Sequence, residues 1–237
     1  MPIDLNSVRP AATVRTAVGE EGLRAYIRAV YAFMAGGLAL TGAVAWYGYS
    51  SGLYPAIART PLIWLVVFAP LAMVMFLSFR IQKMSLTTAQ VTYWLYAALV
   101  GLSLSGIFMM YTGQSIARVF FITAGTFGGM SLWGYTTRKD LSGWGSFLFM
   151  GLIGVIIASL VNVFLRSTAV QFAVSVMGVL VFVGLTAYDT QRIKQLYYAA
   201  DSSDTLGKMV VMGALKLYLD FINLFLMLLR LFGGRRS

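Results

Sequence analysis

Two acidic residues lie inside long apolar stretches of this 237-residue chain, where carboxylates are rare. Asp189 follows a tyrosine near the end of one apolar segment, and Asp220 lies well inside the next. Because a helix rises about 1.5 Å per residue, Asp220 is expected roughly 20 Å along its helix, near the middle of a bilayer. An ionised carboxylate at that depth costs at least about 2.5 kcal/mol, so such a residue normally faces a partner or a water-filled cavity. The two aspartates are therefore the leading candidates for a functional site.

A pair of neighbouring carboxylates has a definite chemistry. When both are ionised they repel, so one of them takes up a proton more readily and the pair titrates as a unit. Such a pair could sense protons in a chain that contains no histidine. It would also attract a hard divalent cation, although calcium takes six to eight oxygen ligands. We therefore expect Asp189 and Asp220 to form a pH sensor on an ion pathway and a weak, transient calcium site. Calcium would be a transported ion, and no cofactor or catalytic residue is expected.

Three basic residues could neutralise these carboxylates. Lys216 lies one turn before Asp220 on the same helix face, although lysine before an acid is the weaker order. Arg192 follows Asp189 at the third position, and Asp189 could also snorkel to the interface. Arg80 ends the second apolar segment, where it could latch onto Asp189 or act as an ordinary positive flank. The sequence alone leaves these partners open.

The elements that position these residues are membrane helices. Hydrophobic residues make up 59% of the chain and charged residues 11%, whereas a soluble domain carries about 25% charged residues. A helix needs about 20 mostly apolar residues to cross a bilayer. The sequence offers seven such segments, at 26–49, 62–79, 88–111, 116–135, 144–165, 170–188 and 206–232. The short connections predict an all-α bundle of antiparallel neighbours, with one transmembrane domain at 25–237 after a flexible cytoplasmic tail at 1–24. The late, long first segment is unlike a signal peptide.

The distribution of basic residues predicts the orientation. One side would carry Arg9, Arg15, Arg24, Arg28, Arg80, Lys83, Arg138, Lys139, Arg192, Lys194 and Lys208. The other loops would carry only Arg59, Arg118 and Arg166. We therefore expect a membrane protein with a cytoplasmic N-terminus. The C-terminal Arg230, Arg235 and Arg236 disagree with this rule, so the last segment either crosses against it or dips in and returns.

Several classes of protein are excluded by composition. The absence of cysteine and histidine excludes a disulfide framework, a Cys/His zinc site and a Ser-His nucleophile system. The net charge of +10 is spread thinly and forms no dense basic patch, so no nucleic acid partner is expected. Small residues four apart predict close helix packing. These pairs are Gly48 with Gly52, Gly101 with Ser105, and Gly125 with Gly129.

Three long motifs resemble the Bax inhibitor-1 (transmembrane Bax inhibitor motif) family, in its bacterial YccA-like branch. They are FGGMSLWGYTTRKDLSGWGSFLFMGLIG from Phe127, AYDTQRIK from Ala187 and ALKLYLDFINLFLMLLRLFG from Ala214. The resemblance covers nearly the whole chain after the tail. It implies a protein of the bacterial inner membrane, with a seven-helix bundle whose last helix is central and wrapped by the other six. It also implies a pH-sensitive calcium leak in which Asp189 and Asp220 form the sensor and Arg80 the latch, while Lys216 could mute calcium affinity.

Other functions remain as alternatives. The same resemblance implies a non-catalytic regulator that binds a membrane-bound ATP-dependent protease through the N-terminal tail or the surface. An intramembrane aspartyl protease would also place two aspartates on consecutive segments, but this chain has LYLD where such enzymes need GxGD, and the later Pro-Ala-Leu element is missing. A retinal protein could use Lys216, but segment 88–111 contains no acidic counter-ion. We therefore predict a non-enzymatic channel.

Overall fold

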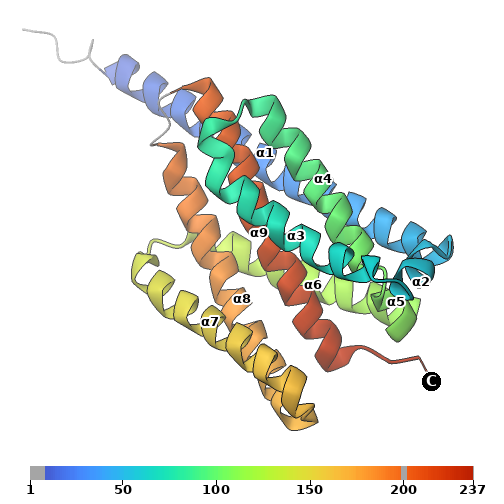
Figure 1. Cartoon of the computed structure of the whole chain (residues 1–237). Helices are drawn as coiled ribbons and strands as arrows, with labels where there is room; N and C mark the ends of the chain where they lie inside the picture. Colours follow the sequence, from blue (N-terminus) through green and yellow to red (C-terminus); the bar gives the residue numbers. More distant parts are fainter. Residues whose placement is uncertain (1–8, 199–201, 237) are drawn as a thin grey trace, which may run out of the picture.

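The computed structural model describes residues 9–198 and 202–236, with side chains from residue 19 onward except that of residue 203. Its helices are α1 (Arg9–Ser50), α2 (Leu53–Ala58), α3 (Leu62–Arg80), α4 (Leu86–Leu104), α5 (Ile107–Met110), α6 (Gly113–Thr136), α7 (Ser142–Leu165), α8 (Thr168–Tyr197) and α9 (Ser203–Phe232), with a short 3-10 helix η2 (Ile81–Lys83). Figure 1 shows them as one bundle. No β-strand occurs in these described ranges, which confirms the predicted all-α class.

Seven of these helical stretches are long and apolar enough to span a membrane. They are Gly19–Ser50, Leu62–Lys83, Leu86–Met110, Gly113–Thr136, Ser142–Leu165, Thr168–Tyr197 and Asp204–Phe232. Each contains or closely matches one of the predicted segments, so the number and order of the spans are confirmed. Most of the helices extend past the apolar segments because polar residues at the bilayer surface continue the hydrogen-bonded turns.

The helical structure begins well before the first apolar segment. Helix α1 begins at Arg9, so residues 9–24 of the predicted tail are helical, while the flexibility and cytoplasmic side of the tail stay predictions. Pro10 lies in the first turn, where the missing N–H group is tolerated. A pair between Glu20 and Arg24, with 3.9 Å between their charged atoms, supports the same helical register. The rest of the predicted tail, residues 1–8, lies outside the described residues.

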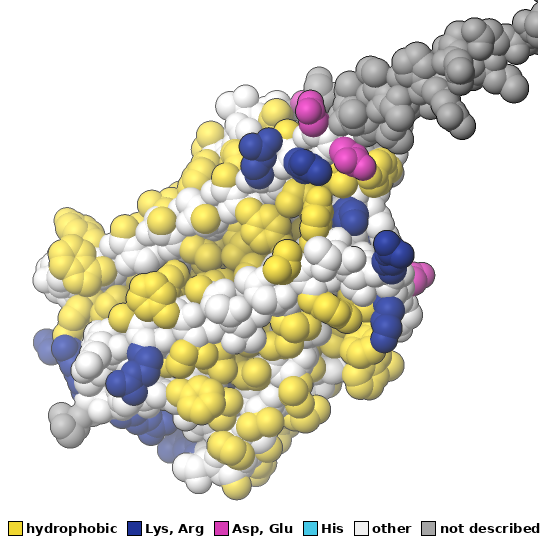
Figure 2. Space-filling view, turned by 180° about the vertical axis from the view of Figure 1, so that it is seen from behind, with side chains coloured by type: hydrophobic (Ala, Val, Ile, Leu, Met, Phe, Trp, Pro, Cys, Tyr) yellow, Lys and Arg dark blue, Asp and Glu magenta, His cyan; other side chains and the backbone are white. Residues whose placement is uncertain are grey.

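Helix α9 is the centre of the bundle, as the family resemblance implies, but it is not wrapped by all six other spans. It packs against α1, α4, α6 and α8, whereas α3 and α7 make no extensive contact with it within the described ranges. Within its apolar stretch 56% of residues are buried, compared with at most 33% for any other span. Leu217 and Leu224 on this helix are fully buried. The lipid-facing flanks of the outer helices instead carry exposed apolar side chains such as Phe121 and Phe164, and Figure 2 shows apolar side chains over the middle of the bundle with charges at its ends.

Of the three predicted close-packing pairs, the pair of Gly101 and Ser105 is confirmed, Gly48 is packed but its partner Gly52 is not, and the third pair is wrong. A Cβ at Gly101 would lie 2.7 Å from the backbone oxygen of Thr41, so α4 and α1 touch there. A Cβ at Gly48 would lie 2.5 Å from the hydroxyl oxygen of Ser105. Gly125 and Gly129 have no neighbour within 4 Å of such a Cβ, because they lie on a face of α6 that no other described helix covers.

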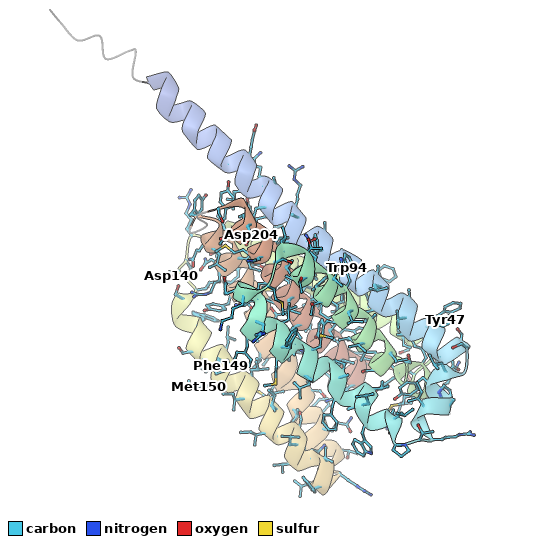
Figure 3. All side chains as sticks on the ribbon, turned by 45° about the horizontal axis from the view of Figure 1, so that its top comes forward. Tyr47, Trp94, Asp140, Phe149, Met150 and Asp204 are labelled. Atoms are coloured by element: carbon cyan, nitrogen blue, oxygen red, sulfur yellow. The ribbon has the colours of Figure 1, made fainter. Side chains whose placement is uncertain are left out.

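The bundle has two ends, which we call the near end and the far end. The near end holds residues 80–85 and 137–141 and the start of α9, whereas the far end holds residues 104–113 and the residues after α9. Figure 1 shows the C-terminus at the end opposite to the start of α1. In Figure 3, Asp140 and Asp204 lie at the near end and Tyr47 at the far end.

The last segment crosses the bundle once and does not return. Helix α9 is continuous, and the residues after it are fixed at the far end. The N–H of Thr112 donates to the carbonyl of Gly234 at 3.2 Å, and the N–H of Arg236 donates to the carbonyl of Met110 at 3.0 Å. The guanidinium of Arg236 also lies over the ring of Tyr49, 5.5 Å from its centroid. Of the two sequence alternatives, the structure therefore has the crossing.

Candidate functional site

The two predicted aspartates lie on neighbouring helices that run in opposite directions. Helices α8 and α9 pack together along their length, and Asp189 and Asp220 are both buried. The two carboxyls lie close enough to interact electrostatically. The prediction that the chain brings these two residues together is therefore met by the geometry of the bundle.

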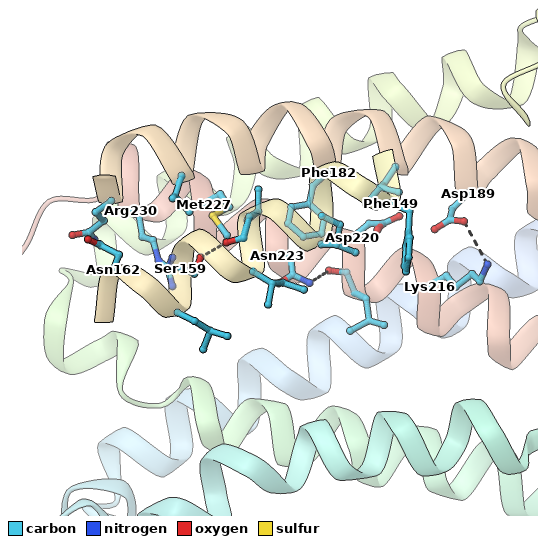
Figure 4. Close-up of a pocket in the computed structure, with 18 of the residues that line it drawn as sticks. Phe149, Ser159, Asn162, Phe182, Asp189, Lys216, Asp220, Asn223, Met227 and Arg230 are labelled. Carbon is cyan, nitrogen blue, oxygen red and sulfur yellow. Dashed lines mark hydrogen bonds and ion pairs between the residues drawn. The ribbon is translucent and has the colours of Figure 1, made fainter. Parts of the chain in front are cut away.

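Lys216 lies beside the two aspartates. It is on α9 with Asp220, but its ion-pair partner is Asp189 on α8. Its Nζ lies 3.5 Å from Oδ1 of Asp189, so the ion pair links α9 to α8 (Figure 4). Lys216 and Asp220 are four residues apart and share one face of α9. Because that face is turned toward α8, the lysine reaches across the helix interface. The expected local neutralisation of Asp220 by Lys216 is replaced by this interhelical contact.

Asp220 is the least satisfied polar group of the cluster. Only 5% of its surface is exposed. Its Oδ2 is buried and has no hydrogen-bond partner among the described residues. Because a buried oxygen without a partner costs free energy, it usually marks a strained or functional group, or a place where a water or ion binds. Asp220 is therefore the point in the cluster where a proton, a water molecule or a cation would be stabilised.

The cluster opens into a long cavity of about 1150 Å³. Its walls come mainly from α7, α8 and α9 (Figure 4). On α7 the lining extends from Ser142 to Val163, which corresponds to about 32 Å at 1.5 Å per residue. Helix α7 packs along α8 and, within the described ranges, makes no extensive contact with α9. The cavity is the space that this one-sided packing leaves, and it extends over most of the depth of a bilayer.

The predicted latch, Arg80, is not part of this site. It is exposed at the C-terminal end of α3 and does not line the cavity. Helix α3 packs against α4, on a different side of the bundle from α8. In the described part of the chain, Asp189 forms no ion pair with Arg80. It also forms none with Arg192, the other partner predicted for it. Lys216 makes the contact that was expected of Arg80, because it lies on the helix that packs directly beside Asp189.

Gln191 and Lys194, two and five residues after Asp189, connect α8 to the loop between α6 and α7 and to the last turn of α6. The side-chain oxygen of Gln191 accepts from the N–H of Leu141 at 2.9 Å, and its amide nitrogen donates to the carbonyl of Lys139 at 2.8 Å. Lys194 donates to the carbonyl of Tyr135 at 3.0 Å. Sequence reasoning missed these anchors, although two polar side chains at the end of an apolar segment in AYDTQRIK were a visible signal.

The same loop contains an aspartate with a structural role. Oδ1 of Asp140 accepts a hydrogen bond from the N–H of Ser142 at 2.9 Å, at the start of α7. This bond and the Ser142 hydroxyl hold the pKa of Asp140 below its usual value. Asp140 is outside the membrane spans and outside the cavity. It therefore serves as a reference carboxylate for experiments on Asp189 and Asp220.

The cluster supplies too few ligands for a permanent metal site. No group of three or more His, Cys, Asp or Glu residues comes together in the part of the chain that the structure describes. Calcium takes six to eight oxygen ligands, and here a lysine competes for one of the two carboxylates. The arrangement fits the binding of protons, or brief contact with a cation, better than metal storage.

Seven helices long and apolar enough to cross a bilayer define an integral membrane protein, and it holds two buried aspartates with a half-buried lysine beside them. The family model described as "Inhibitor of apoptosis-promoting Bax1" matches residues 23–237. The chain therefore belongs to the Bax inhibitor-1 family, which confirms the resemblance seen in its motifs. Its assignment to the YccA-like branch stays a prediction.

Relatives of this chain occur in several bacteria. "Inner membrane protein YbhL" of Escherichia coli K12 is 53% identical over 219 residues, covering 91% of this chain and 94% of that protein. "Uncharacterized protein RP147" of Rickettsia prowazekii is 49% identical over 219 residues, covering 92% and 93%. "Uncharacterized membrane protein SpyM3_0260" of Streptococcus pyogenes is 35% identical over 215 residues, covering 90% and 93%. None of these three names describes an enzyme.

Proposed function

We propose that this protein is a pH-sensitive cation leak channel of the bacterial inner membrane, with calcium as the transported ion. The observation that carries the proposal is the buried, unpartnered oxygen of Asp220 beside the Asp189–Lys216 ion pair, in a cavity at membrane depth. Carboxylates at that depth are costly and are usually functional. The name of the Escherichia coli relative supports the inner membrane.

The near end would face the cytoplasm. The loops at this end carry Arg80, Lys83, Arg138 and Lys139, together with Arg192, Lys194 and Lys208 close by. An excess of Lys and Arg in short loops favours the cytoplasmic side. Because the start of α1 lies at the same end, the N-terminus would be cytoplasmic as well.

The charge of the cluster gives the proposed direction of the pH response. With both carboxylates ionised and Lys216 charged, the formal charges add to −1, and one bound proton makes the cluster neutral. The first proton is expected on Asp220, which lacks a partner, and it leaves the ion pair intact. A second proton, bound by Asp189 at lower pH, removes the negative half of the ion pair that links α8 to α9. We therefore expect the link to weaken, and the leak to increase, as the pH falls.

The cavity explains why the flux would be a leak and not a rapid current. Charged and polar side chains line the part near Asp189, whereas apolar side chains such as Leu160, Val163 and Met227 line much of the part toward the far end. An apolar segment is a barrier to hydrated ions, because it offers no ligands to replace their water. A cation that reaches Asp189 must also compete with Lys216 for the carboxylate. Both barriers would keep the rate low.

Calcium flux into proteoliposomes, measured from pH 5 to 8, tests the proposal. Asp189→Asn should leak at neutral pH as the wild type does at acidic pH, with a flat pH profile. Asp220→Asn should reduce the flux and also flatten the profile, because a cation-binding carboxylate is lost. Asp140→Asn is the matched control, since it removes a carboxylate outside the cavity. The sensor would be refuted by an unchanged pH profile in both cavity variants, or by an equal change in Asp140→Asn.

A further inference from the structure

The far end of the cavity is basic. Arg230, in the last turn of α9, and Arg235, just after it, both line the cavity. The backbone of Arg235 is held in place because it forms a bridge with Tyr111. The neighbouring Arg236 is engaged elsewhere, since its guanidinium donates to the carbonyl of Phe108 at 3.0 Å. Two of the three C-terminal arginines therefore face the cavity mouth.

No acidic side chain balances these arginines at the far end. The connecting segments 51–61, 105–112 and 166–167 and the residues after α9 contain no Asp or Glu, but they contain Arg59 and Arg166. In the view of Figure 2, acidic side chains appear at one end of the bundle only, whereas basic side chains appear at both. The far mouth therefore favours an anion supplied from outside the chain.

The part of the cavity between these arginines and Asp220 is apolar in character. Its two central polar side chains bond to their own helices: the hydroxyl of Ser159 donates to the carbonyl of Val155 at 2.7 Å, and the amide of Asn223 donates to the carbonyl of Leu219 at 2.8 Å. Their polar groups are thus satisfied without a ligand. The amides of Asn162 and Gln171 also line the cavity toward the far end, and most of the remaining wall is apolar, including Leu160 and Val163 from α7.

The length of this apolar part equals the depth of one lipid leaflet. Ten residues of α9 separate Asp220 from Arg230, which is about 15 Å of helix. The hydrocarbon core of a bilayer is about 30 Å thick, so one leaflet contributes about half of that. An anionic group held by Arg230 and Arg235 at the interface would therefore carry an acyl chain down to the level of Asp220.

We propose that the far half of the cavity binds one anionic phospholipid from the adjacent leaflet. Arg230 and Arg235 hold its phosphate, since guanidinium groups form paired hydrogen bonds with phosphate oxygens. One acyl chain lies along the apolar wall and ends near Asp220. The acyl chain of the lipid enters the cavity from the side, between α7 and α9. Helix α7 packs on α8 and makes no extensive contact with α9 within the described ranges, so this side is open. A free phosphate ion would leave the apolar wall unused, so the lipid is the better fit. This site does not depend on the proposed leak.

Native mass spectrometry of the full chain with added phosphatidylglycerol or phosphatidylcholine of identical acyl chains tests this site. We expect one phosphatidylglycerol to be retained at least about tenfold more tightly than phosphatidylcholine. The Arg230→Gln/Arg235→Gln double variant should lose this preference. Arg118→Gln should keep it, since Arg118 is an exposed arginine near the far end that does not line the cavity. Retention of the preference in the double variant, or an equal loss in Arg118→Gln, would overturn the proposal.

A second variant tests the acyl chain and does not depend on the arginines. Leu160→Trp narrows the apolar wall and leaves both arginines in place, so it should weaken phosphatidylglycerol binding. Leu160 is largely exposed, so the larger side chain can be accommodated without disturbing the core. Unchanged binding in Leu160→Trp, together with full displacement of the lipid by water-soluble glycerophosphoglycerol, would show that the headgroup alone is bound and would overturn the acyl-chain assignment.

Discussion

Lys216→Met is the most informative single substitution, because it leaves two carboxylates in the cavity without a neighbouring cation. The charges of the cluster then add to −2, compared with −1 in the wild type. Two charges 3.5 Å apart interact by about 5 kcal/mol at an effective dielectric constant of about 20. The Lys216 side chain is 40% exposed and that of Asp189 13%, so only part of this energy survives. We expect a loss of about 2 kcal/mol in unfolding free energy at pH 7, between the value for exposed pairs and that for buried ones.

The loss should depend on pH in a defined direction. As the pH falls, the carboxylates take up protons and the excess negative charge disappears, so the difference between Lys216→Met and wild type should shrink. Asp189→Asn should be milder than Lys216→Met at pH 7, because Lys216 can then turn to Asp220 on its own helix. Thermal unfolding in detergent at pH 5 to 8 measures both effects.

A double-mutant cycle identifies the partner of Lys216. We expect a coupling energy of about 2 kcal/mol between Lys216→Met and Asp189→Asn, and a smaller one between Lys216→Met and Asp220→Asn. A larger coupling to Asp220 would mean that the ion pair stays within α9, and it would refute the interhelical link. A Lys216→Met loss that does not change with pH would refute the charge argument.

Two further predictions concern the packing that holds α8 and α9 in place. Gly134→Ala places a Cβ 2.3 Å from the backbone oxygen of Ala187, so it should lower the unfolding free energy by about 1–3 kcal/mol. Gly129→Ala is the control and should be neutral, because a Cβ there meets open space. Thermal unfolding compares the two variants. Tyr218→Phe removes a buried 2.7 Å hydrogen bond to the Thr41 hydroxyl and should cost about 1 kcal/mol in the same assay, with no change in the pH profile of the leak.

The membrane-spanning helices were predicted well from the sequence, because the length of each apolar segment matches the thickness of a bilayer. All seven spans and the burial of Asp189 and Asp220 could be read in this way. The start of α1 could not be predicted from hydropathy, because residues 9–24 are polar enough to lie in solvent and are still compatible with a helix. Hydropathy identifies the apolar part of a helix, but it does not show where the hydrogen-bonded turns begin.

The partner of Asp189 could not be predicted, because the choice depends on which helices are neighbours. From the sequence, Arg80 and Arg192 were the partners considered for Asp189, and Lys216 was considered only for Asp220 on its own helix. The packing of α3 on α4 removes Arg80, while the packing of α9 on α8 brings in Lys216. Likewise, Gly125 and Gly129 have the spacing of a packing motif, but the described helices leave them uncovered. Spacing shows which residues share a helix face, and only the tertiary fold shows what that face contacts.

The order of charges along the cavity indicates whether a proton or a calcium ion reaches the two aspartates more easily. A cation entering from the near end meets Lys216 at the carboxylates, and one entering from the far end first meets Arg230 and Arg235. A proton can reach Asp220 through water and needs no coordination shell, whereas calcium needs several oxygens and must displace the lysine from Asp189. In the proposed function the paired aspartates therefore act first as a proton site, and they would bind calcium only after Lys216 has moved away.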